Sequence, residues 1–256
     1  MMRIGFDGAV LTRGPATGVA LSFLWTLDRY LDLTGHDAIV VMPKGGHPPD
    51  LLTELAGRHD TLTIPRSNAV SGFLRRALHL PRAVEGLGVN LWHSPVTAVP
   101  IRCPIPSIAT VHDFPWRAAD PLGEGPYRSA RSAIRVASRA ADALLVPSQS
   151  TAQDLSDEVR GCDDRIRICP LGVPAAPARS EDATGPFVVL GDDRPRKNLA
   201  RVRNAYAKAC RIEPKLPDLI EIGPHARYVD EPEKDALLRR ATALIHASLH
   251  EGFGLP

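Results

Sequence analysis

Short apolar runs alternate with longer amphipathic segments along most of the chain. This alternation is typical of β-α-β units and predicts an α/β protein with a parallel sheet. In the first part of the chain, the apolar runs predict strands at 4–6, 38–42, 62–64, 89–93, 107–111, 143–147 and 165–169. The segments between them predict helices at 19–33, 50–57, 72–78, 127–141 and 150–159.

A proline-rich stretch interrupts this pattern at 174–186. It holds three prolines, one glycine and almost no bulky apolar side chain, which is the composition of a linker. Beyond it the pattern resumes, with strands predicted at 187–190, 219–222 and 243–247 and helices at 199–211 and 231–241. We therefore predict two Rossmann-like, doubly wound domains facing a cleft, at 1–178 and 179–256.

The second of these domains is expected to be incomplete. It is small for a doubly wound domain, and its last residues, Gly252 to Pro256, have the composition of a turn. A proline at the end of such a turn is typical of the first position of a helix. The pattern therefore predicts a chain that is truncated at its C-terminal end.

The composition is that of an ordinary globular protein, with 44% hydrophobic and 23% charged residues. No apolar run reaches the roughly 18–20 residues of a membrane span, and the first residues do not resemble a signal peptide. The four cysteines are scattered, with no C-x-x-C pair, which indicates a reduced protein without structural zinc. These features predict a cytoplasmic protein.

Positive charge is concentrated between residues 58 and 139, where 11 arginines and no lysine stand against 5 acidic residues. Arg128, Arg131, Arg135 and Arg139 have the 3-4-4 spacing that places them on one side of a helix. One interpretation is that this side is simply a solvated surface. The other is that it contacts an anionic acceptor, or anionic lipid headgroups at the inner face of a membrane. We expect no nucleic-acid partner.

Loops that follow parallel strands usually carry the ligand site. After the strand predicted at 187–190, the cations Arg194, Arg196 and Lys197 precede a predicted helix. Cations are unfavourable at a helix N-terminus by about 0.3–1 kcal/mol each, and a bound anion such as a nucleotide diphosphate reverses this cost. Alternatively, Asp192 and Asp193 neutralise the cations and the loop is only surface.

A second candidate follows the strand predicted at 243–247. Glu251 can accept hydrogen bonds from two sugar hydroxyls, and the glycines on both sides of Phe253 allow a close approach of the backbone to a ligand. The alternative is an ordinary tight turn with an exposed glutamate.

Two further candidates lie in the first domain. His112 follows the strand predicted at 107–111 and can polarise or deprotonate a hydroxyl, or hold a sugar, unless its role is only structural. Gly18 begins the first helix and can admit a phosphate or sugar to the helix N-terminus. The chain has neither G-x-G-x-x-G nor G-x-x-x-x-G-K-[ST], which argues against dinucleotide and P-loop binding.

Taken together, five stretches resemble glycosyltransferase family 4, the retaining enzymes of the GT-B fold that include many bacterial mannosyltransferases. The resemblance runs from Arg3 to Pro256, and its specific parts are 111–113, 146–155, 169–173, 195–199 and 251–256. The family is metal-independent. The chain departs from the family in its first loop, where only Gly18 matches, and in Asp192, where many relatives have arginine.

The resemblance assigns a role to each candidate residue. It implies that Arg196 and Lys197 hold the donor diphosphate and that His112 lies near the reacting centre. Glu251 becomes the first glutamate of an E-x7-E motif and contacts the transferred sugar, while the second falls beyond Pro256. The donor-binding residues that it implies are Gly18, Arg196, Lys197, Gly252, Phe253 and Gly254.

The sequence therefore predicts a retaining hexosyltransferase that uses a nucleotide-diphosphate sugar and a glycan or lipid-linked acceptor, with no metal or cofactor. The combination of Pro-Arg-Lys-Asn with His-Asp favours a GDP-mannose-type donor. Two alternatives stay open at this point. One is an inactive remnant that binds only an acceptor or a partner, and the other is a sugar-nucleotide epimerase or an NAD-binding Rossmann protein.

Overall fold

A computed structural model describes residues 2–12, 17–44, 49–67, 80–117, 127–172, 180, 183–192, 194–223, 226–227 and 229–254. The contacts within the chain divide it into two compact units. The first consists of Met1–Asp113 and Tyr127–Val173, and the second of Phe114–Pro126 and Pro174–Pro256. The helix predicted at 72–78 and most of the predicted linker lie outside the described residues.

The first unit is built on a parallel sheet, as the alternating pattern predicts. Its described strands are β1 (Arg3–Asp7), β2 (Asp37–Pro43), β3 (Leu62–Thr63), β4 (Arg66–Ser67), β5 (Leu91–Ser94), β6 (Ser107–Thr110), β7 (Ala143–Val146) and β8 (Ile166–Ile168). Their order is β3-β2-β1-β5-β6-β7-β8, with β4 paired to β2. The order reverses direction between β1 and β5, which makes this the switch point where ligands of such sheets bind.

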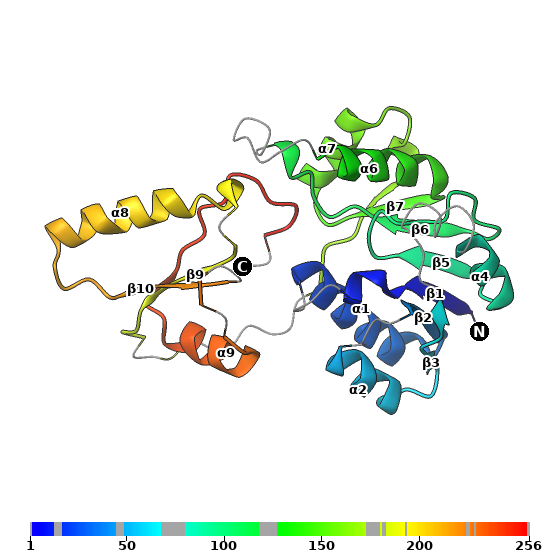
Figure 1. Cartoon of the computed structure of the whole chain (residues 1–256), viewed down its shortest axis with the longest axis horizontal. Coiled ribbons are helices and arrows are strands. Elements are labelled where there is room, and N and C mark those ends of the chain that lie inside the picture. Colours follow the sequence, from blue (N-terminus) through cyan, green and yellow to red (C-terminus); the bar gives the residue numbers. More distant parts are fainter. Residues whose placement is uncertain are drawn as a thin grey trace. The chain divides into compact units, whose positions relative to one another are not determined.

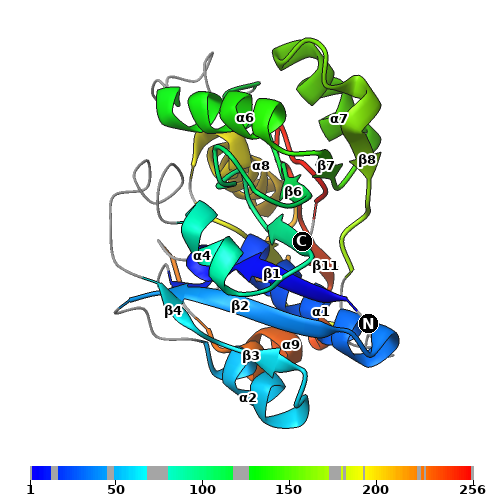
Figure 2. The ribbon, with the colours of Figure 1, turned by 90° about the vertical axis from the view of Figure 1, so that its right-hand side faces the viewer.

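Helices cover both faces of this sheet (Figures 1 and 2). The described helical elements of the unit are η1 (Gly8–Thr12), α1 (Gly18–Thr34), α2 (Asp50–Arg58), α4 (Leu80–Gly86), α6 (Arg128–Ala140), α7 (Gln149–Glu158) and η3 (Asp163–Arg165). Alternate residues of β2 point to opposite faces. Val40 and Met42 pack with Leu24 of α1 and Leu52 of α2, whereas residues 39 and 41 join a separate core cluster with Leu80 and Trp92. The sheet is therefore buried on both faces.

The second unit has a smaller parallel sheet. Its described strands are β9 (Phe187–Leu190), β10 (Leu219–Ile222) and β11 (Ala243–Leu244), in the order β10-β9-β11. Its described helical elements are η4 (Pro195–Lys197), α8 (Leu199–Ile212) and α9 (Glu231–Arg240). Val188 of β9 packs against Leu237 of α9, and Val189 packs on the other face against Leu199 and Val202 of α8.

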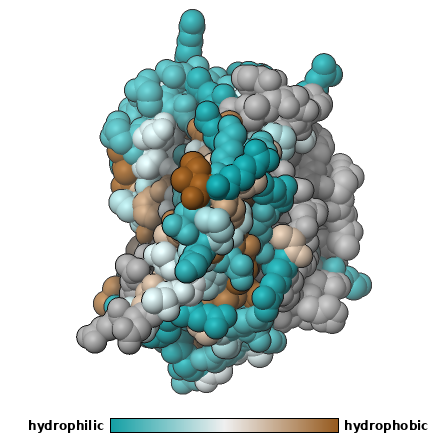
Figure 3. Space-filling view, turned by 90° about the vertical axis from the view of Figure 1, so that its left-hand side faces the viewer, coloured by the Kyte–Doolittle hydropathy of each residue, from teal (hydrophilic) through white to brown (hydrophobic). Residues whose placement is uncertain are grey.

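One face of this small sheet is incompletely covered. A groove of about 440 Å³ runs between α8 and the sheet, and its lining is almost entirely apolar, with Phe187, Val202, Tyr206 and Ile245 among the lining residues. The face shown in Figure 3 is mostly hydrophilic, with hydrophobic surface in separate patches. Within the described part of the chain, no helix is long and apolar enough to cross a membrane.

Candidate functional site

The site is built on the crossing of two loops at the carboxyl ends of β9 and β10. The backbone N–H of Gly191 donates to the carbonyl of Ile222 at 3.0 Å. A Cβ atom on Gly223 would lie only 1.7 Å from the carbonyl oxygen of Gly191, so no larger residue fits there without a backbone shift. Gly191 itself has a φ of 147°, which favours glycine. The close crossing fixes the direction in which the chain leaves β9.

Arg196 and Lys197 lie in the short η4 turn immediately before α8, so their predicted place at the start of a helix is confirmed. Asn198 joins the two elements in the left-handed conformation, with a φ of 59°, which asparagine tolerates better than most residues. Its side-chain amide donates to the carbonyl of Ala247 at 3.1 Å. The N–H of Leu249 donates to the carbonyl of Arg196 at 2.8 Å. These bonds tie the segment after β11 to the start of α8.

Both cations meet the carboxylate of Glu251. The ammonium nitrogen Nζ of Lys197 lies 2.5 Å from Oε1 of Glu251, and a guanidinium nitrogen of Arg196 lies 3.8 Å from Oε2. The side chains of Arg196, Lys197 and Glu251 are 5%, 11% and 22% exposed. Buried charges are stable only when they are paired, and two cations here share one carboxylate. The three side chains together therefore carry a net charge of +1.

The electrostatic surroundings keep Glu251 ionised. Burial raises the pKa of Glu251, but hydrogen bonds from Lys197 and Ser248 and the charges of Lys197 and Arg196 outweigh it, so the pKa lies below its usual value. A further group, His246, places its Nε2 atom 3.6 Å from Oε1 of Glu251. Sequence reasoning missed His246, because nothing in the periodicity separates it from the strand predicted at 243–247.

Asp192 has its own cation. Nε of Arg194 donates to Oδ2 of Asp192 at 2.8 Å. Burial raises the pKa of Asp192, but the hydrogen bonds and charge of Arg194 together lower it overall. Asp192 therefore neutralises Arg194, as the alternative of a self-neutralised loop expects, whereas Lys197 pairs with Glu251. Asp193 lies outside the described residues.

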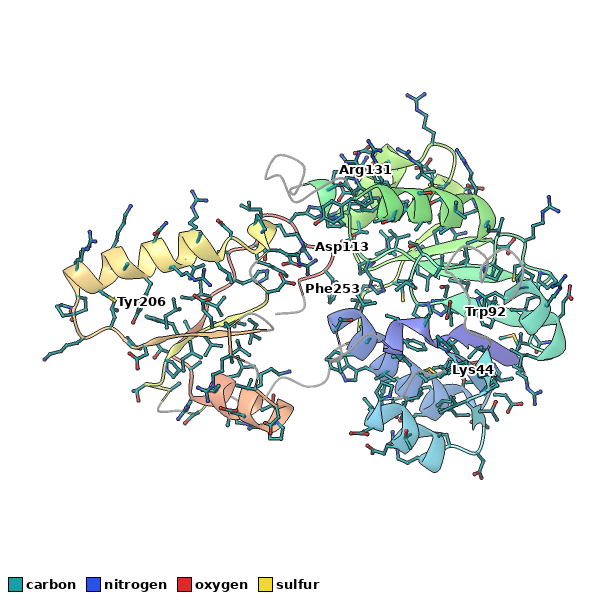
Figure 4. The ribbon with its side chains drawn as sticks, viewed as in Figure 1. Lys44, Trp92, Asp113, Arg131, Tyr206 and Phe253 are labelled. Atoms are coloured by element: carbon teal, nitrogen blue, oxygen red, sulfur yellow. The ribbon has the colours of Figure 1, made fainter. Side chains whose placement is uncertain are left out.

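The glycine-rich turn follows Glu251 directly. Gly252 is buried, and Phe253, labelled in Figure 4, keeps 39% of its surface exposed. Gly254 has a φ of 85°, with open space where a side chain would be. The turn thus places one exposed aromatic ring two residues after Glu251, and Leu255 and Pro256 lie outside the described residues.

His112 lies in the first unit, two residues after β6. Its Nε2 atom donates to the carbonyl of Pro95 at 2.7 Å, which leaves Nδ1 as the acceptor of the neutral ring. Burial lowers the pKa of His112, against smaller opposing effects of the Pro95 bond and Asp113. The ring is therefore neutral near pH 7 and can accept a proton or a hydrogen bond.

A second histidine, His93 of β5, was not among the predicted site residues. Its Nε2 atom lies 2.9 Å from the hydroxyl oxygen of Thr110 in β6. Burial, with a smaller contribution from His112, lowers the pKa of His93 to about 4. Because His93 lies inside a predicted strand, its position indicated only a core residue. The signal that could have identified it is its place at the end of that strand, beside the switch point of the sheet.

Gly18 is the first residue of α1, as predicted. The N-terminus of this helix is capped by Thr17, whose hydroxyl oxygen accepts from the N–H of Ala20 at 3.3 Å. The structure therefore brings Arg196, Lys197 and Glu251 together in the second unit, with Gly252, Phe253 and Gly254 beside them. His112 and Gly18 belong to the first unit.

Three of the four arginines of helix α6 are exposed on one side as predicted, whereas Arg131 is only partly exposed. Arg128, Arg135 and Arg139 are exposed, whereas Ile134 and Ala137 are buried on the opposite side. Figure 4 labels Arg131 on this helix. Arg135 is paired with Glu158 of α7 at 2.9 Å, so part of the positive charge is already neutralised.

Comparison with known proteins gives one family. The family model described as Glycosyltransferase Family 4 matches residues 22–176, which is more than half of the chain. A search of curated proteins finds no match to this chain.

Several solved structures share the fold. HepE (Alr3699) of Anabaena, in complex with UDP and glucose, matches with a TM-score of 0.60 and 15% identity over 99% of this chain and 76% of that one. The lipopolysaccharide outer core galactosyltransferase WaaB has a TM-score of 0.59 and 14% identity over 99% and 76%. The catalytic domain of starch synthase IV from Arabidopsis thaliana, bound to ADP and acarbose, has a TM-score of 0.62 and 11% identity over 100% and 80%. The predicted α/β fold of the GT-B class is confirmed.

Proposed function

Because the chain belongs to glycosyltransferase family 4, we propose that it transfers a hexose from a nucleotide-diphosphate sugar to a glycan or lipid-linked acceptor, with retention at the anomeric carbon. The observation that carries this proposal is the meeting of Lys197 and Arg196 with Glu251 at the start of α8. The HepE structures, which hold UDP or UDP-glucose, support a nucleotide-sugar donor.

We assign the donor diphosphate to Arg196 and Lys197. Both are held immediately before α8, where backbone N–H groups lack partners within the helix and favour an anion. Cleavage of the sugar–phosphate bond leaves negative charge on the departing diphosphate, and cations that are already in place stabilise that charge. The net charge of +1 on the three side chains favours an incoming dianion.

Glu251 then has two successive partners. Before the donor binds, its carboxylate accepts from Lys197. Once the diphosphate attracts Lys197, the carboxylate becomes available to the hydroxyls of the sugar. An ionised carboxylate accepts strong hydrogen bonds from such donors. The low pKa of Glu251 keeps it in the accepting form at neutral pH. The backbone of Gly252 to Gly254 and the ring of Phe253 complete the proposed sugar contact.

In the first unit we assign a substrate contact to His112. Its Nε2 proton is committed to Pro95, so the nitrogen that faces a substrate is the acceptor Nδ1. A neutral imidazole can accept a hydrogen bond from a hydroxyl or take its proton, the standard roles of histidine in catalysis. We assign the acceptor to this unit.

The identity of the donor nucleotide can be tested by measuring the affinity of the chain for different nucleotide sugars. Isothermal titration calorimetry with GDP-mannose, UDP-glucose and UDP-N-acetylglucosamine should give saturable binding of at least one, and we expect GDP-mannose to bind best. Lys197→Ala should weaken it about 10- to 100-fold, the usual contribution of a charge-assisted hydrogen bond. The matched control Lys208→Ala removes an exposed lysine of the same region and should change nothing. Equal affinities in the two variants would refute the donor site.

We also propose that the arginine side of α6 contacts anionic lipid at the inner face of a membrane, where a lipid-linked acceptor would reside. The chain should sediment with vesicles containing phosphatidylglycerol and not with phosphatidylcholine alone, because basic side chains near an anionic surface contribute about 1 kcal/mol each. Reversing the charge of Arg128 and Arg139 should abolish this, and the same change at the exposed Arg211 of α8 should not. Equal sedimentation of all three proteins would contradict the proposal.

A further inference from the structure

One carboxylate oxygen in the second unit lies between two nitrogen groups. Oε1 of Glu251 accepts from Nζ of Lys197 at 2.5 Å and lies 3.6 Å from Nε2 of His246. His246 stands two residues after β11, and 30% of its side chain is exposed. A neutral imidazole at this distance forms no hydrogen bond. A protonated ring would be attracted to the same oxygen and would compete with Lys197 for it.

Charged groups from two segments meet at the carboxylate that His246 approaches. Glu251 faces it from its own segment, and Lys197 and Arg196 face the same carboxylate from η4. Ser248 adds a hydrogen bond to Glu251, and the carbonyl of His250 lies 3.4 Å from Arg196. With His246 neutral, this set carries a net charge of +1, and with His246 protonated it carries +2.

We propose that His246 is a positioning residue of the donor site. Its protonated ring holds Oε1 of Glu251 and releases Lys197 to the donor diphosphate. The inference rests on the proposed donor site and deepens it. It follows that the affinity for a nucleotide-diphosphate sugar is higher when the ring of His246 carries a proton than when it is neutral, so the affinity increases as the pH falls.

The physical basis is a competition for Lys197. In the free protein a close, largely buried contact with Glu251 holds the lysine, and the donor diphosphate competes with Glu251 for it. A second cation on Oε1 weakens the hold of Glu251 on Lys197 and adds a positive charge beside an incoming dianion. Both effects act in the same direction, so protonation should tighten binding rather than weaken it.

The test is calorimetry of GDP-mannose and UDP-glucose between pH 5.5 and 8.5, a range in which the diphosphate diester of these donors keeps a constant charge. The wild-type chain should bind about 5- to 10-fold more tightly at the acidic end, which is the effect of one added charge a few ångströms away in a partly solvated site. His246→Gln should keep the alkaline affinity at every pH. His246→Lys, a permanent cation, should show the acidic affinity at pH 8.5.

The matched control is His36→Gln, which removes a partly exposed histidine of the first unit and should keep the wild-type pH dependence. Circular dichroism establishes that each variant is folded, and His246→Asn replaces the glutamine variant if that one is not. Binding that is lost in Lys197→Ala but has the same pH dependence in wild type and His246→Gln would overturn the role of His246 and leave the donor site standing. Absence of binding at every pH, or binding unaffected by Lys197→Ala, would overturn both.

Discussion

Lys197 and Glu251 are 54 residues apart in the sequence, yet Nζ of the lysine donates to Oε1 of the glutamate at 2.5 Å. The contact joins the turn before α8 to the segment after β11, two loops that follow neighbouring parallel strands. Removal of the carboxylate should therefore leave two cations buried without it. We expect Glu251→Gln to lower the free energy of unfolding of the second unit by about 1–3 kcal/mol.

Chemical denaturation monitored by far-UV circular dichroism measures this loss. Because an anion can take the place of the carboxylate, added nucleoside diphosphate should restore most of the lost stability in Glu251→Gln. The matched control is Glu213→Gln, at the exposed end of α8, which should be neutral. If Glu251→Gln has the same free energy of unfolding as the wild type, the contact with Lys197 contributes nothing to stability.

The stability contributed by Glu251 should depend on pH in a defined direction. The pKa of Glu251 in the folded chain lies below the value of 4.5 that it has when unfolded. The contribution is therefore fully present above pH 4.5 and is lost as the pH falls through the lower, folded value. The difference between wild type and Glu251→Gln, measured by denaturation from pH 7 to pH 3, should shrink below pH 4.5. A difference that stays constant over this range would contradict the assignment.

His93 should make the first unit sensitive to acid. Its pKa falls from 6.5 to about 4 in the folded chain because the ring is buried, so the unfolded chain binds the proton more readily between these values. Acidification from pH 6.5 to pH 4 should thus remove about 3 kcal/mol of stability through His93 alone. His93→Gln should reduce this loss while keeping a polar group near Thr110, and His36→Gln should not. An equal loss in all three proteins would contradict the prediction.

Gly223 should tolerate no side chain. A Cβ atom there would overlap the carbonyl of Gly191, so Gly223→Ala must move the loop that leads to Arg196 and Lys197. We expect a loss of about 1–3 kcal/mol in the second unit and a weaker affinity for the donor. Gly57→Ala, in α2 with open space around it, is the control and should be neutral or stabilising. Equal melting temperatures for the two variants would show that the loop can adjust.

The pattern of apolar positions is sufficient to predict most of the framework. The strands β9 and β10 begin and end at the predicted residues, and α8 extends one residue beyond its predicted end. The predicted strand at 243–247 is shorter in the structure, where β11 ends at Leu244. Ile245 still donates to the carbonyl of Val188 at 2.8 Å, but the chain then turns toward Arg196 and leaves the sheet. The hydrogen bonds that Asn198 and Arg196 make with this segment are tertiary contacts, which the pattern of apolar positions cannot predict.

The strand β4 was not predicted because both of its residues are polar, and α4 was not predicted because seven residues are too few to give a periodic signal. In the site, Arg196 and Lys197 could be chosen from their place before a helix, and Glu251 from its place after a strand. Their contact could not be predicted from spacing, since it depends on the order β10-β9-β11. His246 and His93 were missed for a related reason, because each lies in a segment that reads as strand and acquires its role only from a neighbouring strand or loop.

The most direct test of the account is the release of nucleotide from the donor. The purified chain is incubated with GDP-mannose or UDP-glucose, with and without a lipid-linked acceptor, and the free nucleoside diphosphate is measured over time. We predict acceptor-dependent release by the wild-type chain. Glu251→Gln should reduce it at least about 100-fold, the usual effect of losing a residue that contacts the transition state, while Glu213→Gln leaves it unchanged. Release that is equal in wild type and Glu251→Gln, or donor binding without any release, would contradict the proposed transferase site.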